Sequence, residues 1–308
     1  MKRLLISISV LQIILAIFFI PTSAIFSAES VAKLGKIVIG GKTNTEQYLL
    51  SMLLAIRLER AGFEVKQKVG LLTLKARQAL LAGEIDVYWE YTGTAYKGFF
   101  KQSKRSVAID AIKLFEEVKR RDQDNGIIWL ERARLNNTFA LAMKQSAAKK
   151  AGIVSISDLA AAYNSGKRFK IASTQEFYDR PDGFKPLSKL YAFEVPHEAF
   201  SFVASKATIG ALQRGQVQVA MIFATNPEII SNNLKVLADD KQHFPVYNPA
   251  PNFRKEVLDK YPHIENIVNV IGPLLDDETI VNLNHDVDVN NVAIKDAARD
   301  WLRKNGLY

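Results

Sequence analysis

The sequence predicts an α/β protein of two lobes, each a sheet flanked by helices, with a ligand cleft between the lobes. Strand-like and helix-like segments alternate between residues 36 and 88, and a second alternating set follows between residues 138 and 223. Such alternation is typical of sheets with helical crossovers. Clefts form preferentially between lobes and at the carboxyl ends of parallel strands. With 308 residues and 48% hydrophobic content, the chain can bury both cores.

The first lobe begins with a β-α-β-α-β pattern, and Asn44 or Thr45 can cap its first helix. Short apolar or alternating runs predict strands at residues 36–41, 63–69 and 85–88, and apolar residues at helical spacing predict helices at residues 45–61 and 72–82.

The second set predicts strands at residues 138–143, 169–172 and 217–223, and helices at residues 157–162, 186–191 and 209–214. Three prolines at residues 245–251 indicate a rigid extended connection. The rest of the chain predicts amphipathic helices at residues 254–260, 264–271, 277–284 and 292–304. We therefore expect a discontinuous lobe I of residues 33–137 and 248–308, and a lobe II of residues 138–247.

The first 28 residues are typical of a secretory signal peptide. Lys2 and Arg3 precede an apolar run at residues 4–20, and small residues follow Pro21. We expect cleavage between Ala24 and Ala28 and export to the periplasm. An uncleaved membrane anchor is the alternative, because the apolar run is close to the shortest that spans a bilayer.

Composition excludes several classes of function. Cysteine is absent, which excludes disulfides, thiolate metal sites and a cysteine nucleophile. The net charge is +9, but the basic residues are dispersed among acidic ones, which argues against nucleic-acid binding. The four histidines are scattered, and neither a nucleophile elbow nor a phosphate loop is present. We therefore expect no enzymatic activity, no metal and no cofactor.

The most informative segment is residues 88–96, directly after a predicted strand. It places aromatic rings and the hydroxyls of Thr92 and Thr94 around Gly93. Ring faces attract cations, and hydroxyl groups donate to carboxylates. The segment therefore suits a small ligand that carries both charges.

Five collinear segments resemble the substrate-binding proteins of ABC importers for osmoprotectants, the glycine betaine, choline and carnitine family. They include Gly-Gly-Lys-Thr-Asn-Thr-Glu-Gln at residues 40–47 and Glu-Tyr-Thr-Gly-Thr at residues 90–94, with further matches at residues 79–88, 136–141 and 244–251. The resemblance implies a type II periplasmic binding protein. Such a protein closes on a quaternary amine and delivers it to an ABC permease with its ATPase subunits. We expect a monomer.

The resemblance also implies which residues form the site. The aromatic cage for the quaternary ammonium group would consist of Tyr91, Phe139, Phe223 and Tyr247. The ligand's carboxylate would meet Lys42, Thr94 and Arg180, and Asn137 would place an oxygen near the methyl groups.

This chain departs from the family pattern at three positions. Phe139 and Phe223 stand where tyrosine is common, so two hydroxyls are missing, and Trp89 stands where proline is usual and adds a ring beside the expected site. The rings of both phenylalanines still offer the π faces that bind a cation.

Two other functions remain open from the residues alone. A binding protein for an amino acid would need a buried carboxylate for the α-ammonium group, and Asp86, Glu90 or Asp182 could supply it. A secreted hydrolase could use Asp86 and Glu90, which strand spacing places on one face, for acid–base chemistry.

Overall fold

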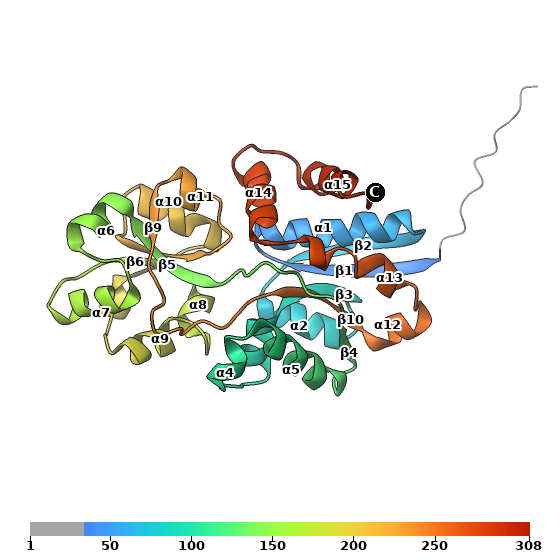
Figure 1. Cartoon of the computed structure of the whole chain (residues 1–308), viewed down its shortest axis with the longest axis horizontal. Helices are drawn as coiled ribbons and strands as arrows, with labels where there is room; N and C mark the ends of the chain where they lie inside the picture. Colours follow the sequence, from blue (N-terminus) through green and yellow to red (C-terminus); the bar gives the residue numbers. More distant parts are fainter. Residues whose placement is uncertain (1–33) are drawn as a thin grey trace, which may run out of the picture. The chain divides into compact units, whose positions relative to one another are not determined.

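The structure, a computed structural model, describes residues 34–308, which contain two five-stranded sheets (Figure 1). We call the sheet that holds the first strand and its covering helices lobe I, and the other sheet with its helices lobe II. Residues 1–33, and with them the predicted signal peptide, lie outside the described residues. Within residues 34–308, no helix combines the length and the apolar character that crossing a membrane requires.

The sheet of lobe I has the strand order β2-β1-β3-β10-β4. β1 runs parallel to β2 and β3, whereas β10 runs antiparallel to β3 and β4. The sheet thus joins segments from both ends of the described chain. Its strands are β1 (Gly35–Lys42), β2 (Phe63–Leu71), β3 (Val87–Tyr91), β4 (Ile127–Trp129) and β10 (Pro249–Arg254).

The proline-rich segment, predicted to be an extended connection, forms the interior strand β10. An interior strand excludes proline unless the missing N–H has no partner to lose. Here the carbonyls of Pro249 and Pro251 accept from Ala133 and Leu130, which lie beyond the end of β4. The nitrogen and the carbonyl of one residue point to the same side of a strand, so each proline nitrogen faces the side beyond the end of β4. Neither proline therefore removes a hydrogen bond to β3.

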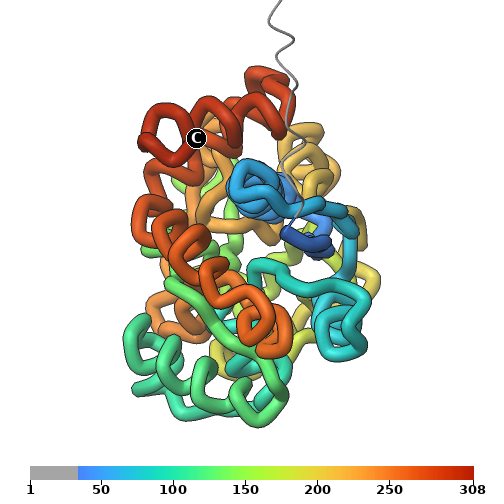
Figure 2. Tube along the Cα trace, turned by 90° about the vertical axis from the view of Figure 1, so that its right-hand side faces the viewer, coloured from blue at the N-terminus to red at the C-terminus, as the bar shows by residue number. Residues whose placement is uncertain are grey.

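The helices of lobe I cover both faces of its sheet. Asn44 caps α1, because its side chain accepts from the amide of Gln47. Figure 2 shows α1 in blue beside the C-terminal helices in red, and Arg57 of α1 donates to the carbonyl of Leu307. The helices are α1 (Thr45–Arg60), α2 (Thr73–Leu81), α3 (Thr92–Thr94), η1 (Ala95–Phe99), α4 (Arg105–Ala108), α5 (Ala111–Gln123), α12 (Lys255–Lys260), α13 (Ile264–Val268), η4 (Gly272–Leu274), α14 (Asp277–Asp288) and α15 (Ile294–Lys304).

The sheet of lobe II repeats the pattern of lobe I, with the order β7-β6-β8-β5-β9. β6 runs parallel to β7 and β8, and β5 runs antiparallel to β8 and β9. In both sheets, the antiparallel fourth strand directly follows a segment that crosses between the lobes. The strands are β5 (Phe139–Lys144), β6 (Ile171–Ser173), β7 (Phe200–Phe202), β8 (Val219–Phe223) and β9 (Leu234–Val236).

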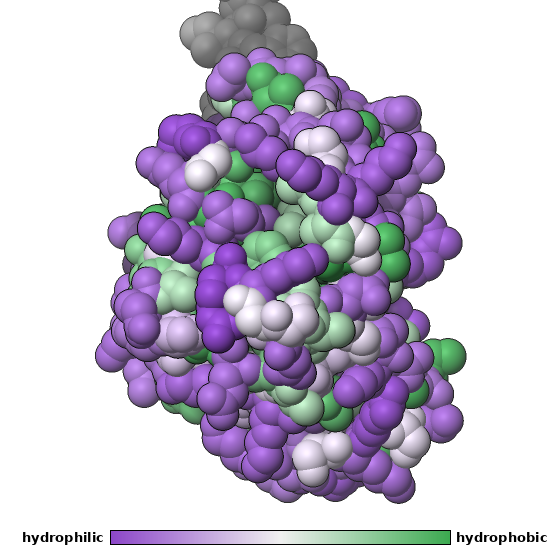
Figure 3. All heavy atoms as spheres, turned by 90° about the vertical axis from the view of Figure 1, so that its left-hand side faces the viewer, coloured by the Kyte–Doolittle hydropathy of each residue, from purple (hydrophilic) through white to green (hydrophobic). Residues whose placement is uncertain are grey.

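Shorter helices flank the sheet of lobe II. Ser155 caps α7 in a reciprocal arrangement with Asp158. The face of the molecule in Figure 3 is mainly hydrophilic, with hydrophobic residues scattered in small groups. The helices are α6 (Gln145–Ala151), α7 (Ile156–Asn164), α8 (Gln175–Asp179), α9 (Phe184–Tyr191), η2 (His197–Ala199), η3 (Ser205–Ala207), α10 (Thr208–Gln213) and α11 (Glu228–Ser231).

Most predicted strands and helices are confirmed within a few residues. The third strand begins two residues later than predicted, at Val87, because the amides of Glu84 and Ile85 donate to the carbonyl of Ala79 and complete the end of α2. The helix predicted at residues 264–271 ends at Val268. The short strands β4, β7 and β9 were not predicted, since three residues give too little periodicity to recognise.

Candidate functional site

A cavity of about 500 Å³ lies between the lobes and is lined by residues from both. Lobe I contributes the carboxyl ends of the parallel strands β1 and β3, which is where α/β sheets commonly bind ligands. All eight residues predicted for the site line this cavity: Lys42, Tyr91, Thr94, Asn137, Phe139, Arg180, Phe223 and Tyr247.

The aromatic walls meet at Phe139. β5 and β8 pair in a register that sets Phe139 opposite Phe223, and their ring centroids are 5.1 Å apart. Tyr247 packs edge-on against Phe139 at 5.5 Å. Phe177 of α8, which was not predicted, also lines the cavity and lies 5.0 Å from Phe139.

Two of the rings already attract cations of the protein itself. The ammonium nitrogen of Lys42 lies 5.0 Å from the centroid of the Tyr91 ring. The guanidinium carbon of Arg180 lies 5.2 Å from the centroid of Phe139. Both distances fall within the range of cation–π attraction, so these ring faces are placed where positive charge is stabilised.

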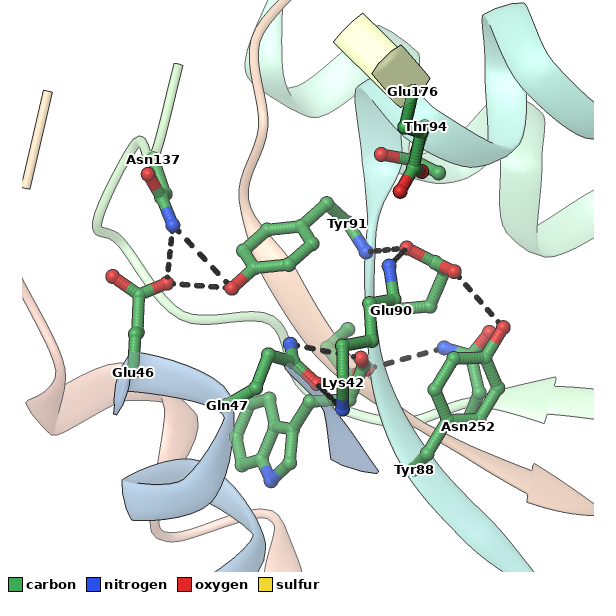
Figure 4. A network of polar contacts seen from close by, with 12 residues as sticks. Lys42, Glu46, Gln47, Tyr88, Glu90, Tyr91, Thr94, Asn137, Glu176 and Asn252 are labelled. Carbon is green, nitrogen blue, oxygen red and sulfur yellow. Dashed lines mark hydrogen bonds and ion pairs between the residues drawn. The ribbon is translucent and has the colours of Figure 1, made fainter. Parts of the chain in front are cut away.

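Lys42 is buried and paired with Glu90. Its ammonium donates to Oε1 of Glu90 at 2.5 Å, and the same oxygen accepts from the amide of Tyr91. The second oxygen accepts from the hydroxyl of Tyr88 (Figure 4). Burial, followed by the charge of Glu90, holds the pKa of Tyr88 well above its usual value. Glu90 therefore fixes Lys42 at the cavity wall, while two of the three ammonium protons stay available.

Arg180 is buried and paired with Asp182. Two guanidinium nitrogens donate to the carboxylate at 2.8 and 2.7 Å, and one of them also donates to Thr94 across the cleft at 3.2 Å. The hydroxyl of Tyr247 donates to Asp182 at 2.7 Å. Burial raises the pKa of Asp182, but the charge of Arg180 and the hydrogen bonds outweigh it and hold the pKa below its usual value.

Asn137 lies on the crossing segment that leads into β5. Its side-chain nitrogen donates to Glu46 at 2.8 Å and to the hydroxyl of Tyr91 at 3.4 Å. Its side-chain oxygen is buried and has no hydrogen-bond partner among the residues that the structure describes. Asn137 thus lies at the cavity, but the oxygen expected near the methyl groups of the ligand is covered by other protein atoms.

Glu46 is a buried acid of the site that the sequence interpretation missed. Its carboxylate accepts from Tyr91, Asn137 and Thr225 at 2.7, 2.8 and 2.8 Å, and Figure 4 shows it at the hydroxyl end of Tyr91. Burial raises its pKa despite these hydrogen bonds. An acid in the first turn of a helix normally indicates an interaction with the helix dipole, so its position alone signals nothing more.

Glu46 does not line the main cavity. It lines a smaller one of about 230 Å³, which shares Asn137 and Phe223 with the main cavity. Glu46 therefore reaches the main cavity only through its neighbours.

The expectation for Trp89 is wrong. Trp89 does not lie beside the site but is fully buried in the core beneath α1. Trp89 and Tyr91 face the same side of β3, but only Tyr91, at the end of the strand, passes beyond that core.

The three carboxylates considered for an amino-acid site do not line the cavity. Asp86 accepts from the amide of Val38 and from Arg254, Glu90 holds Lys42, and Asp182 holds Arg180. Among residues 34–308, no group of three or more histidines, cysteines and acids could hold a metal ion.

Comparisons with known proteins agree with this geometry. A family profile described as the substrate binding domain of an ABC-type glycine betaine transport system matches residues 35–304. The glycine-betaine-binding protein of Pseudomonas aeruginosa is 35% identical over 286 residues, which cover 91% of this chain and 91% of that protein.

Solved structures show the same architecture. The apo structure of YehZ from Escherichia coli, at 32% identity, covers 89% of this chain and 99% of that one with a TM-score of 0.63. A choline-binding protein in complex with choline is 14% identical, with a TM-score of 0.64 over 88% of this chain and 89% of the other. The fold is thus the predicted one, a type II periplasmic binding protein with two lobes.

Proposed function

This chain belongs to the family of substrate-binding domains of ABC-type glycine betaine transport systems, and on that premise we propose that it binds a quaternary ammonium osmoprotectant of the glycine betaine, choline or carnitine type. Members of this family are binding proteins and not enzymes. They act outside the cytoplasm and deliver a small ligand to the permease components of an importer.

One observation supports the proposed ligand above the others: a single interlobe cavity gathers five aromatic residues together with the cations of Lys42 and Arg180. A trimethylammonium group cannot donate hydrogen bonds, so ring faces are its natural partners, each contributing about 0.5 to 2 kcal/mol. We assign this cage to Tyr91, Phe139, Phe223 and Tyr247, with Asn137 at the wall of the same cavity.

We assign the ligand's carboxylate to Lys42, Arg180 and Thr94. Lys42 pairs with Glu90, and Arg180 pairs with Asp182 and Glu176, but each cation keeps donors beyond those that these partners occupy. Arg180 already donates to Thr94 across the cleft. A carboxylate held there would therefore contact both lobes and favour closure.

Calorimetry with glycine betaine, choline, carnitine and arginine tests the proposal. We expect heat from at least one of the three quaternary amines and none from arginine, because the acid that lines the cavity, Glu176, is already paired with Arg180. Tight arginine binding without heat from any quaternary amine would overturn the proposal in favour of an amino-acid binding protein.

We further propose the finer features predicted from the sequence. These are an N-terminal signal peptide at residues 1–28, location in the periplasm, a monomeric state, and lobe boundaries near residues 137 and 247. Mass spectrometry of the exported protein tests the cleavage, and light scattering tests the monomer.

A further inference from the structure

The buried charges around the main cavity do not balance. Lys42 is paired with Glu90, and Arg180 is paired with Asp182. Glu46 is 3% exposed, and within residues 34–308 no lysine, arginine or histidine forms an ion pair with it. Glu46 is therefore a buried acid next to the main cavity that has hydrogen-bond donors but no ion-pair partner in the described part of the chain.

Two unpaired oxygens lie near Glu46. The side-chain oxygens of Asn137 and Asn284 are both buried without a hydrogen-bond partner in the described part of the chain, and both residues line the small cavity with Glu46. An isolated buried carboxylate costs several kcal/mol of stability, and proteins keep such groups mainly at functional sites. A cation held beside Tyr91 would offset that cost while Glu46 is ionised.

The contacts of Glu46 lead to the proposed cage. The hydroxyl of Tyr91 donates to Glu46, which increases the electron density of the phenol ring. A more negative ring face attracts a cation more strongly, and the carboxylate itself attracts it across a medium of low polarity. Asn137 is fixed by the same carboxylate.

We propose that Glu46 is the counter-charge of the ligand's quaternary ammonium group, and that it acts through Tyr91 and Asn137 without touching the ligand. This inference rests on the proposed function. It makes Glu46 a positioning residue that selects for positive charge, whereas the rings alone select for shape and apolar surface.

The first test replaces the charge and keeps the shape. Calorimetry compares wild type and Glu46→Gln with choline, with glycine betaine, and with the carbon isostere of each, in which a tert-butyl group replaces the trimethylammonium group. We expect Glu46→Gln to weaken binding of the quaternary amines at least about tenfold and binding of the isosteres less than about twofold. An equal loss for charged and uncharged ligands, or no loss, would overturn the inference.

Asp288→Asn is the matched control. Asp288 also lines the small cavity, but its carboxylate accepts from Thr45 and pairs with Lys206, and its side chain is 20% exposed. Removal of this charge should change choline affinity by less than about twofold. An effect as large as that of Glu46→Gln would mean that any nearby acid suffices, which contradicts the inference.

The second test uses the wild-type protein and pH. Choline has no titrating group in this range, so its affinity should fall as pH is lowered from about pH 8 to about pH 5 and Glu46 takes up a proton. The other charged groups at the small cavity are Lys206, Glu228 and Asp288, and Lys42 and Glu90 lie beyond Tyr91. The variant Glu46→Gln distinguishes Glu46 from these other groups. The part of the pH dependence that Glu46 causes should be absent in this variant.

The outcomes separate the two proposals. Wild-type protein that binds none of the quaternary amines refutes the proposed function and the inference with it. The wild-type protein could instead bind choline with the same affinity at every pH, and no more tightly than Glu46→Gln does. That result refutes the inference and leaves the proposed function in place. The ligand-free variant should be at least as stable as wild type at about pH 8, since a buried charge is gone.

Discussion

The two walls of the main cavity are built differently. On the side of lobe I, Tyr91 and Lys42 are each fixed from behind by an acid: Glu46 accepts from Tyr91, and Glu90 accepts from Lys42. On the side of lobe II, Phe139, Phe177 and Phe223 hold one another by ring contacts at 5.0 and 5.1 Å. The first wall should therefore respond to charge and pH, and the second to volume.

Arg180 is the exception within lobe II. Its ion pair with Asp182 stands beside the phenylalanines, and its second contact reaches Thr94 of lobe I. The hydrogen bonds of Lys42, by contrast, go to Gln47 and Glu90 of its own lobe. The comparison predicts that substitutions at the Arg180 pair affect both walls, while substitutions at either wall alone have smaller effects.

The largest effect is expected for Asp182→Asn. It leaves the buried guanidinium of Arg180 without its bidentate partner, and removal of one member of a buried ion pair costs about 3 to 5 kcal/mol. Urea denaturation measures the free energy of unfolding. Glu84→Gln, in the exposed pair with Lys68, is the control and should cost at most about 1 kcal/mol.

The same pair should respond to acid. The pKa of Asp182 lies below its usual value in the folded protein, so the stabilisation is complete above the unfolded pKa of about 3.9. It is lost as pH falls through the lower, folded pKa. The difference between wild type and Asp182→Asn should thus shrink only in strong acid, and a difference that is already gone at neutral pH would contradict the ion-pair account.

The next largest effect is expected for the cage tyrosines. Tyr91→Ala and Tyr247→Ala each remove one wall and should weaken quaternary amine binding at least about tenfold, on the order of 1.4 kcal/mol. Calorimetry measures it. Tyr308→Ala, which removes an exposed ring outside the cavity, is the control and should bind like wild type. Unchanged affinity in both cage variants would refute the assigned cage.

A smaller effect is expected for Tyr91→Phe, which keeps the ring and removes the donor to Glu46. The loss of one hydrogen bond to a buried carboxylate should weaken binding by about 1 kcal/mol, roughly fivefold. If the lobe I wall were held by packing alone, as the lobe II wall is, this variant would bind like wild type. That result in titrations with choline would remove the contrast between the walls.

The sequence predicted the residues that line the cavity better than the acids behind them. Six of the eight predicted residues lie within the matched segments, and the resemblance also pointed to Arg180 and Phe223 outside them; all eight line the cavity. The acids behind the lobe I wall did not follow, because the partners of each pair lie far apart in the chain: Lys42 and Glu90 are separated by 48 positions, and Glu46 and Thr225 by 179. Only the folded chain brings them together.

The same limit applies to the fold. Apolar or alternating runs predicted β1, β2 and β8 from their own residues. β10 was missed, because its place inside the sheet depends on β4 ending before the prolines, and no local pattern contains that information. Local signals thus predict which segments are strands, and long-range contacts decide where an unusual strand can lie.

The smallest effect is expected for Phe139→Tyr, which restores a hydroxyl to the lobe II wall. The ring face stays in place, and the guanidinium of Arg180, 5.2 Å from the ring centroid, offers donors nearby. We expect binding equal to that of wild type or up to a few times tighter, since the ring already provides the cation–π contact. Calorimetry with glycine betaine measures it.

Phe177→Tyr is the matched control for that variant. Phe177 belongs to the same wall but is 1% exposed, so a hydroxyl placed there has to find a partner inside the core. An unsatisfied buried hydroxyl costs about 1 to 3 kcal/mol, which urea denaturation would detect. Loss of binding in Phe139→Tyr with full stability would mean that the new oxygen crowds the ligand. In that case the missing hydroxyl in this chain enlarges the cage, and the lobe II wall selects ligands by size.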